Sequence, residues 1–173
     1  MAKRKSASAE PDSLLSRLPQ LVPLAINWAQ ELELHLLKTG KPLAFWQVAD
    51  ASDVGVRQPG KVRPCLVDEM PKVGNPALAA AALEIGFLGP ETLGLTLGYG
   101  IFIKRTHAGR RWLLRHELRH VAQCEAAGGI EPFPGEYLQQ VLRDGYQATA
   151  LEQDARYHEK RHAGKPAAEL KRP

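Results

Sequence analysis

The chain has 173 residues, of which 44% are hydrophobic and 24% charged, a composition typical of globular proteins and unlike that of disordered or fibrous chains. Its two cysteines, Cys65 and Cys124, are too few for a disulfide-framed scaffold or a cysteine-rich zinc finger. The net charge is +4, but residues 1–10 carry +2 and residues 156–173 carry +4, which leaves −2 for the rest of the chain. The basic residues therefore lie in the tails, and we expect no nucleic-acid partner.

We predict a single domain over residues 14–162, a disordered basic tail at residues 1–13 and a disordered tail at residues 163–173. The early basic residues are followed by polar residues rather than an apolar run, which is not the pattern of a signal peptide. No stretch approaches the ~20 apolar residues that a membrane span needs. We therefore expect a cytoplasmic protein that does not bind membranes.

The first predicted element is a helix. Apolar residues recur at helical spacing through residues 14–38, and Pro19 and Pro23 mark an early break in the pattern. The helix is therefore expected at about residues 24–37, with Gly40 as its C-terminal stop.

Two short strands and a second helix are predicted next. Residues 43–48 and 62–67 have the composition of strands, and the polar, turn-rich residues 49–60 join them. Pro76 occupies the first turn of an Ala- and Leu-rich helix over residues 77–85.

Residues 92–104 carry the clearest strand pattern, because large apolar side chains alternate with small or polar residues. The small residues include Gly94, Gly98 and Gly100, which leave one face of the backbone bare. Such a face permits close approach by another chain or a ligand. The alternative is that the glycines mark bulges or tight packing under a helix.

Three helical segments follow. The first is predicted over residues 110–127 and ends at Gly128-Gly129. A loop rich in proline leads to a second segment at residues 136–143, and the last helix is predicted over residues 150–162.

The helix predicted at residues 110–127 contains an HExxH motif, formed by His116, Glu117 and His120. Two histidines four residues apart lie on one helical face, ~6 Å apart along the axis, so both imidazoles can bind one metal ion. Glu117 lies on the flank of that face, where its carboxylate can reach a water on the metal without being a ligand. The spacing indicates a metal site with a general base beside it.

Such a site needs a third protein ligand, and the best candidate is Glu152 on the last predicted helix. Two histidines and one glutamate form the ligand set of a catalytic zinc, with a fourth position open to water. Glu152 also completes a capping box with Thr149, so the alternative is a structural role at the helix start. Asp154 is the second candidate ligand.

These residues resemble the gluzincin branch of zinc metallopeptidases, which combine an HExxH helix with a glutamate-bearing Glu-x-x-Ala element on a following helix. The segments His116-Glu-Leu-Arg-His-Val-Ala-Gln123, Gly145-Tyr146 and Leu151-Glu152-x-x-Ala155-Arg156 are more similar to a group of small bacterial proteins with an HELxHVxQ helix. This closer resemblance covers about residues 90–160.

The resemblance implies an α+β, zincin-like fold, in which a small antiparallel or mixed sheet packs on the HExxH helix and the C-terminal glutamate-bearing helix. It implies that His116, His120 and Glu152 bind Zn²⁺ and that Glu117 is the catalytic base for hydrolysis of a peptide or protein substrate. The chain lacks a membrane span, which distinguishes it from the membrane-embedded relatives, and it lacks thermolysin's length, second domain and glutamate-motif asparagine.

The resemblance also suggests how a substrate would bind. The glycine-bearing strand at residues 92–104 would be the sheet edge along which an extended peptide lies. Tyr146 or Tyr137 is the candidate donor to the developing oxyanion, each with a purely packing role as the alternative. Basic residues around the HExxH helix can favour acidic substrates, although for Arg111 and Arg115 a solvated helix face explains the charge as well.

A second hypothesis is a zinc-stabilised regulatory or binding module without catalytic activity, which would contact a protein or nucleic acid through its basic ends. A purely structural zinc site has no need of Glu117 beside the first histidine, so Glu117 favours catalysis. The remaining alternative is that His116 and His120 are surface histidines that bind no metal.

Overall fold

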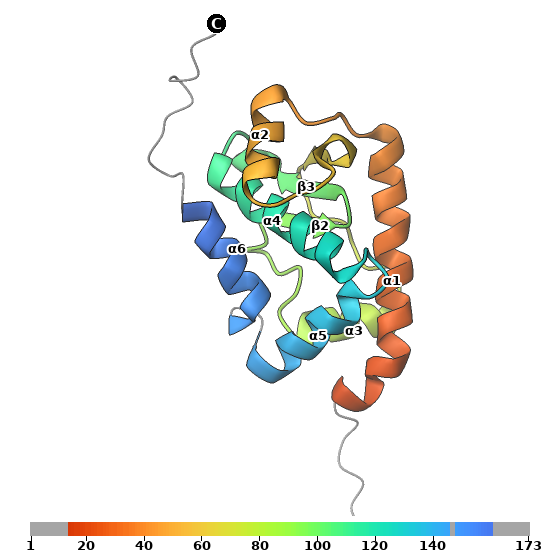
Figure 1. Ribbon diagram of the computed structural model, residues 1–173. Coiled ribbons are helices and arrows are strands. Elements are labelled where there is room, and N and C mark those ends of the chain that lie inside the picture. The colour runs from red at the N-terminus through yellow and green to blue at the C-terminus, as the bar shows by residue number, and fades with distance from the viewer. Residues whose placement is uncertain (1–13, 146–147, 161–173) are drawn as a thin grey trace, which may run out of the picture.

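The computed structural model describes residues 14–145 and 148–160, and in these residues the chain forms six α-helices and a three-stranded mixed sheet (Figure 1). The predicted tails lie outside the described residues. The elements are α1 (Leu14–Thr39), α2 (Phe45–Asp53), η1 (Pro59–Lys61), β1 (Arg63–Val67), α3 (Pro76–Glu84), β2 (Gly94–Leu97), β3 (Gly100–Lys104), η2 (Arg105–His107), α4 (Arg111–Ala127), α5 (Phe133–Asp144) and α6 (Ala150–Lys160).

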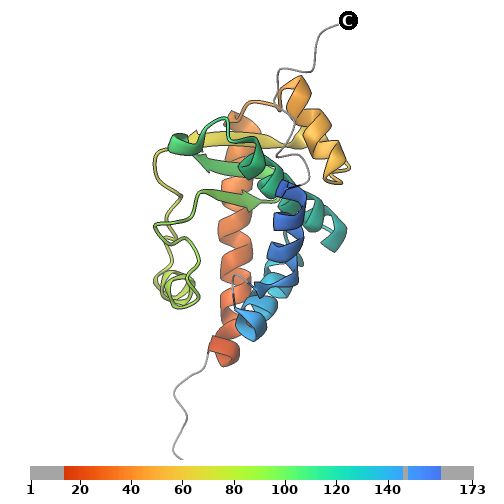
Figure 2. The ribbon, with the colours of Figure 1, turned by 90° about the vertical axis from the view of Figure 1, so that its left-hand side faces the viewer.

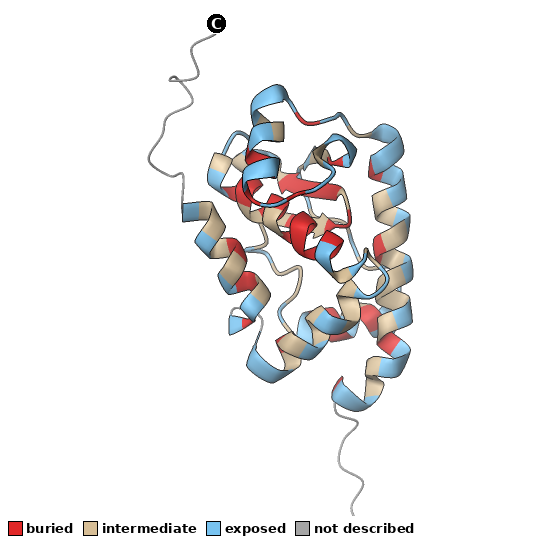
Figure 3. Cartoon of the chain, viewed as in Figure 1, coloured by how far each residue is buried: buried red, intermediate tan, exposed pale blue. Residues whose placement is uncertain are grey.

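The sheet lies between helices on both faces (Figure 2). β3 is its central strand, parallel to β1 and antiparallel to β2. Because side chains alternate along a strand, Ile101 and Ile103 of β3 pack with α4 and α2, whereas Phe102 packs with α1. The buried residues follow this layering, since they gather on α4, on the strands and on the inner face of α1 (Figure 3).

α1 is longer than predicted, because the helix continues through Pro19 and Pro23. Each proline removes one donor to the preceding turn, but the buried face formed by Leu21, Ala29 and Leu36 holds the helix against its neighbours. Tertiary packing therefore outweighs the local cost of the two prolines. Among the described residues, no helix is both long enough and apolar enough to cross a bilayer.

The strand predicted at residues 43–48 is wrong, because this segment leads into α2. The backbone N–H of Ala44 donates to the Gln47 side chain at 2.7 Å, which caps the start of the helix. Ala51 and Val54 then point into the core on one helical face. The apolar run was too short to distinguish a period of two from a period of 3.6.

The single strand predicted at residues 92–104 is a β-hairpin, in which β2 and β3 are joined by Gly98 and Tyr99. Gly98 has a φ of +59°, a conformation that suits glycine in a two-residue hairpin turn. Gly94 and Gly100 face helices rather than open space, because a Cβ there would overlap Glu117 and Leu36 respectively. The glycines therefore serve tight packing under helices, the alternative to an open ligand-binding face.

The other predicted elements are found with shifted ends. β1 and α3 match the strand at 62–67 and the helix at 77–85 within two residues. α4 confirms the HExxH helix and ends at Gly128, which has a φ of +99°. α5 begins three residues earlier than predicted, at Phe133, and α6 is described to Lys160, so residues 161–162 lie outside the described residues.

The two thiols differ in burial, and we expect them to differ in reactivity. Cys124 on α4 is buried, and burial together with the charges of Glu33 and Glu125 raises its pKa to about 12. At pH 8 only about one Cys124 in ten thousand is then a thiolate, the reactive form. We expect a maleimide or iodoacetamide to label one thiol per native chain and two in urea. The variant Cys65→Ser should lose the native labelling, and labelling of Cys124 at the same rate as Cys65 would contradict the prediction.

Candidate metal centre

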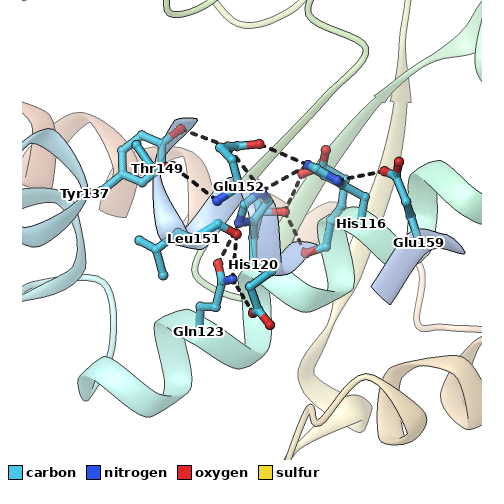
Figure 4. Close-up of polar contacts among 11 residues, drawn as sticks. His116, His120, Gln123, Tyr137, Thr149, Leu151, Glu152 and Glu159 are labelled. Atoms are coloured by element: carbon cyan, nitrogen blue, oxygen red, sulfur yellow. Dashed lines mark hydrogen bonds and ion pairs between the residues drawn. The ribbon is translucent and has the colours of Figure 1, made fainter. Parts of the chain in front are cut away.

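α4 and α6 bring His116, His120 and Glu152 together (Figure 4). The two Nε2 atoms of the histidines lie 3.1 Å apart, and each lies 3.5 Å from a Glu152 carboxylate oxygen. The three side chains are 14%, 11% and 4% exposed, respectively. Each offers one potential ligand atom, and these atoms all lie within 4.8 Å of one another, so the group could hold a metal ion.

The far side of the His120 ring is held by Gln123, one helical turn along α4. His120 Nδ1 lies 2.8 Å from Gln123 Oε1. The amide nitrogen of Gln123 donates to the Leu151 carbonyl at 2.9 Å and to Asp154 at 2.8 Å, so its oxygen must face the ring. An amide oxygen only accepts, and therefore His120 carries its proton on Nδ1 and leaves a lone pair on Nε2.

The far side of the His116 ring is held by Glu159 of α6, whose Oε2 lies 3.0 Å from Nδ1. The Glu159 oxygen lies nearer to the ring than the Glu152 oxygen, which is 3.5 Å from Nε2, so in the neutral ring the proton lies on Nδ1 and Nε2 presents a lone pair. The two Nε2 lone pairs and the Glu152 carboxylate thus converge with no proton between them. Such an arrangement calls for a cation, either a metal ion or an additional proton.

The pKa values in this structure reflect the same need for positive charge. Burial disfavours the charged form of His116, but the bond to Glu152 and the charges of Glu117, Glu152 and Glu159 outweigh it and raise the His116 pKa. Burial also acts to raise the pKa of Glu152, yet the histidines and the hydroxyl of Tyr137 lower it overall. The carboxylate of Glu152 is therefore held ionised, as a metal ligand requires.

The side chain of Glu117 is buried between α4 and β2. Its Oε2 accepts a bond from the Thr96 hydroxyl at 2.7 Å, and its Oε1 lies so close to Gly94 that a Cβ on residue 94 would overlap it. Burial raises the pKa of Glu117, partly offset by His120, His116 and Thr96. Gly94 and Thr96 of β2 thus define the position of this carboxylate beside the histidines.

The capping box is seen in its Thr149 half, whereas the Glu152 carboxylate, which was to complete it, lies against the histidines. The Thr149 hydroxyl caps α6 by accepting the backbone N–H of Glu152 at 3.2 Å, while the Glu152 side chain faces the histidines. Asp154, the second candidate ligand, instead bonds Arg119 and Gln123.

Of the two tyrosines predicted as oxyanion donors, the structure describes only Tyr137. The Tyr137 hydroxyl donates to Glu152 Oε1 at 3.1 Å, so in this structure its proton is directed at that carboxylate. Tyr146 lies outside the described residues.

Four arginines around α4 are held in ion pairs, while a preference for acidic substrates stays a prediction. The pairs are Arg105 with Asp68, Arg111 and Arg115 with Asp50, and Arg119 with Asp154. Arg115 is 1% exposed, so the solvated helix face is wrong for this residue. The ion pairs were not foreseen because their acidic partners lie far away in the sequence.

A cavity of about 140 Å³ opens beside the histidines, between β2, α1, α3 and α5. Its polar end contains His116, Glu117, His120 and Glu152. The remaining wall is mostly apolar and includes Leu18, Leu21, Trp28, Leu78, Leu95 and Phe133. The candidate metal group therefore lies at one end of a largely apolar cavity.

Glu159 and Gln123 were not predicted as parts of the site, although the sequence carries a signal for both. Glu159 lies seven residues after Glu152, two helical turns along the same face of α6. Gln123 lies three residues after His120, a spacing at which side chains on a helix meet.

No protein-family model, curated protein or solved structure matches this chain.

Proposed function

We propose that the protein is a zinc-dependent peptidase with a zincin-like arrangement, in which His116, His120 and Glu152 bind the metal and Glu117 is the general base. The observation that carries the proposal is the convergence of two imidazole lone pairs and an ionised carboxylate at one point, with the buried Glu117 beside them. Ligands of a tetrahedral zinc with ~2.05 Å bonds lie ~3.3 Å apart. The Nε2–Nε2 separation of 3.1 Å and the 3.5 Å from each Nε2 to one of the two Glu152 oxygens are near that distance.

A zinc ion bound there would polarise a substrate carbonyl and make water a stronger nucleophile near neutral pH. Glu117 is placed to accept a proton from the attacking water and to pass it to the leaving amine. The Thr96 hydroxyl holds one oxygen of Glu117, which lines the same end of the cavity as the histidines. A purely structural metal site would not need this additional buried acid, which favours catalysis over a regulatory module.

The free edge of β2 supports a peptide as the substrate. Leu95 pairs with Phe102 and Leu97 with Gly100, while the Lys104 N–H donates to the Leu93 carbonyl. The alternation of an antiparallel ladder then directs the backbone groups of Gly94 and Thr96 away from β3. Both residues line the cavity, so an extended peptide that pairs with this edge would pass beside the candidate metal group.

The cavity indicates which peptides fit. Its volume of about 140 Å³ is close to that of an engineered apolar cavity of ~150 Å³ that holds benzene. One large apolar side chain, such as that of Leu or Phe, would fill it. Away from the histidines and acids the wall is mostly apolar, so a charged side chain would lose its hydration there without gaining a partner.

The test is metal content measured side by side on protein purified without chelators. We expect about one zinc per chain in the wild type and a loss of bound zinc in His116→Ala and Glu152→Ala, because each removes a ligand. His35→Ala, which changes an exposed histidine on α1, is the matched control and should keep its zinc. Absence of zinc from the wild type, together with no uptake on addition of zinc, would contradict the proposal.

A further inference from the structure

We propose that Gln123 is a positioning residue that holds His120 in the tautomer required for metal binding, and that it does so only while α6 is docked on α4. The inference rests on the proposed metal site. It concerns a residue that touches neither the candidate ion position nor the cavity, and it acts through the ring of His120.

The Gln123 amide has one orientation that satisfies its surroundings. Its nitrogen faces two oxygens, the Leu151 carbonyl and Asp154 Oδ2, at 2.9 and 2.8 Å. A flipped amide would place its oxygen against both of these acceptors and would lose both bonds. Gln123 is buried, so water does not compensate for such a loss. The amide oxygen is therefore fixed toward His120 Nδ1 at 2.8 Å.

Both acceptors that fix the amide belong to α6. Asp154 is itself held by Arg119 Nε at 2.6 Å, and Arg119 also donates to the Val54 carbonyl at 2.7 Å. The same helix supplies Glu152 as the candidate third ligand and Glu159 as the partner of His116. Docking of α6 therefore delivers a ligand and fixes both ring tautomers at the same time.

The tautomer matters because a neutral imidazole carries one ring proton. Hydrogen bonding at one ring nitrogen decides which nitrogen keeps it. Without an acceptor at Nδ1, the His120 proton is free to occupy Nε2, the atom that faces His116 Nε2 at 3.1 Å. A proton there occupies the lone pair that a metal needs, so zinc binding would first require a change of tautomer.

The test compares Gln123→Met, which keeps the length of the side chain but removes the amide, with Gln153→Met as the matched control. Gln153 is an exposed glutamine on α6 whose amide bonds the Ala148 carbonyl. Two readouts are measured: the ¹⁵N signals of the histidine rings in metal-free protein, and zinc affinity by competition with a chromophoric chelator. We expect His120 to move from the Nδ1–H toward the Nε2–H form in Gln123→Met, with zinc affinity ~10–100-fold lower. The control should match the wild type in both readouts.

A further variant separates positioning from general destabilisation. Gln123→Glu keeps an acceptor for His120 Nδ1 but removes the amide donor to the Leu151 carbonyl and Asp154. We therefore expect Gln123→Glu to be at least as destabilised toward urea as Gln123→Met, while His120 keeps the Nδ1–H form that Gln123→Met loses.

An unchanged His120 tautomer and an affinity within about twofold of the wild type in Gln123→Met would overturn the inference. Loss of the Nδ1–H form in a folded Gln123→Glu variant, which keeps the acceptor, would also overturn it. Failure of the proposed function would look different, because the wild type itself would then bind no zinc, whereas the tautomer comparison in metal-free protein would still report on Gln123.

Discussion

Replacement of Glu117 by glutamine is expected to abolish peptide hydrolysis while zinc remains bound at the wild-type level. Glutamine has nearly the same shape, so it can keep its place against Gly94 and the Thr96 hydroxyl. It cannot accept a proton, however, and loss of a general base lowers rates by about 10²–10⁴-fold. Because Glu117 is not among the candidate ligands, the metal site should remain intact.

Mass spectrometry measures the cleavage of unstructured peptides in matched pairs. The two peptides of a pair differ in one residue, which is Leu or Phe in one and Asp in the other. The cavity predicts cleavage next to the apolar residue in the wild type. Glu125→Gln is the control, since Glu125 is a buried acid on the same helix that accepts bonds from Arg57, Gln58 and Tyr99 away from the site. Activity of Glu117→Gln within tenfold of the wild type would exclude the base role. A zinc-loaded wild type that cleaves no peptide would exclude the peptidase.

Asp50→Ala is expected to destabilise the fold by about 3–5 kcal/mol, because it breaks a buried ion pair and leaves the buried Arg115 with only one of its two carboxylate partners. Asp50 is 2% exposed and accepts from Arg115 at 2.8 Å and from Arg111 at 2.7 Å. Arg115 also bonds Asp53 and the His158 carbonyl, so the network connects α2, α4 and α6. Loss of Asp50 should therefore weaken the attachment of α6 as well as the stability of the whole domain.

Urea unfolding followed by circular dichroism measures this effect. Asp68→Ala is the matched control, because Asp68 forms an ion pair with Arg105 on the surface. The Arg105 side chain is 57% exposed and the Asp68 side chain 79%, and such surface pairs contribute about 0–1 kcal/mol. The combined variant Asp50→Leu, Arg115→Met should be less destabilised than Asp50→Ala, since it also removes the buried charge of Arg115. Equal losses for Asp50→Ala and Asp68→Ala would show that burial of the network does not matter.

Local sequence patterns were sufficient to predict the parts of the site that lie on single helices. The i, i+4 spacing of His116 and His120 predicted the shared face, and α4 forms as expected. Glu152 could be selected because an incomplete metal site needs a third ligand, and the structure brings it to both histidines. Its metal-binding role remains a prediction.

Long-range contacts could not be read from the sequence, and they account for the errors. The segment before Asp50 looked like a strand because the packing of Ala51 and Val54 against α4 is decided by the fold as a whole. Arg115 looked solvent-exposed because its partner lies 65 residues away. The prolines of α1 are tolerated for the same reason, since distant contacts stabilise the helix around them.

The division of the site between α4 and α6 has a consequence for protein synthesis. A ribosome completes the two histidines 32 residues before Glu152, and Glu159 follows later still. A nascent chain that ends between these points has two imidazoles but neither the acidic ligand nor the contacts that orient the rings. Stable zinc binding would therefore be a late step in the maturation of the protein. A translation product that ends before α6 should not bind zinc stably.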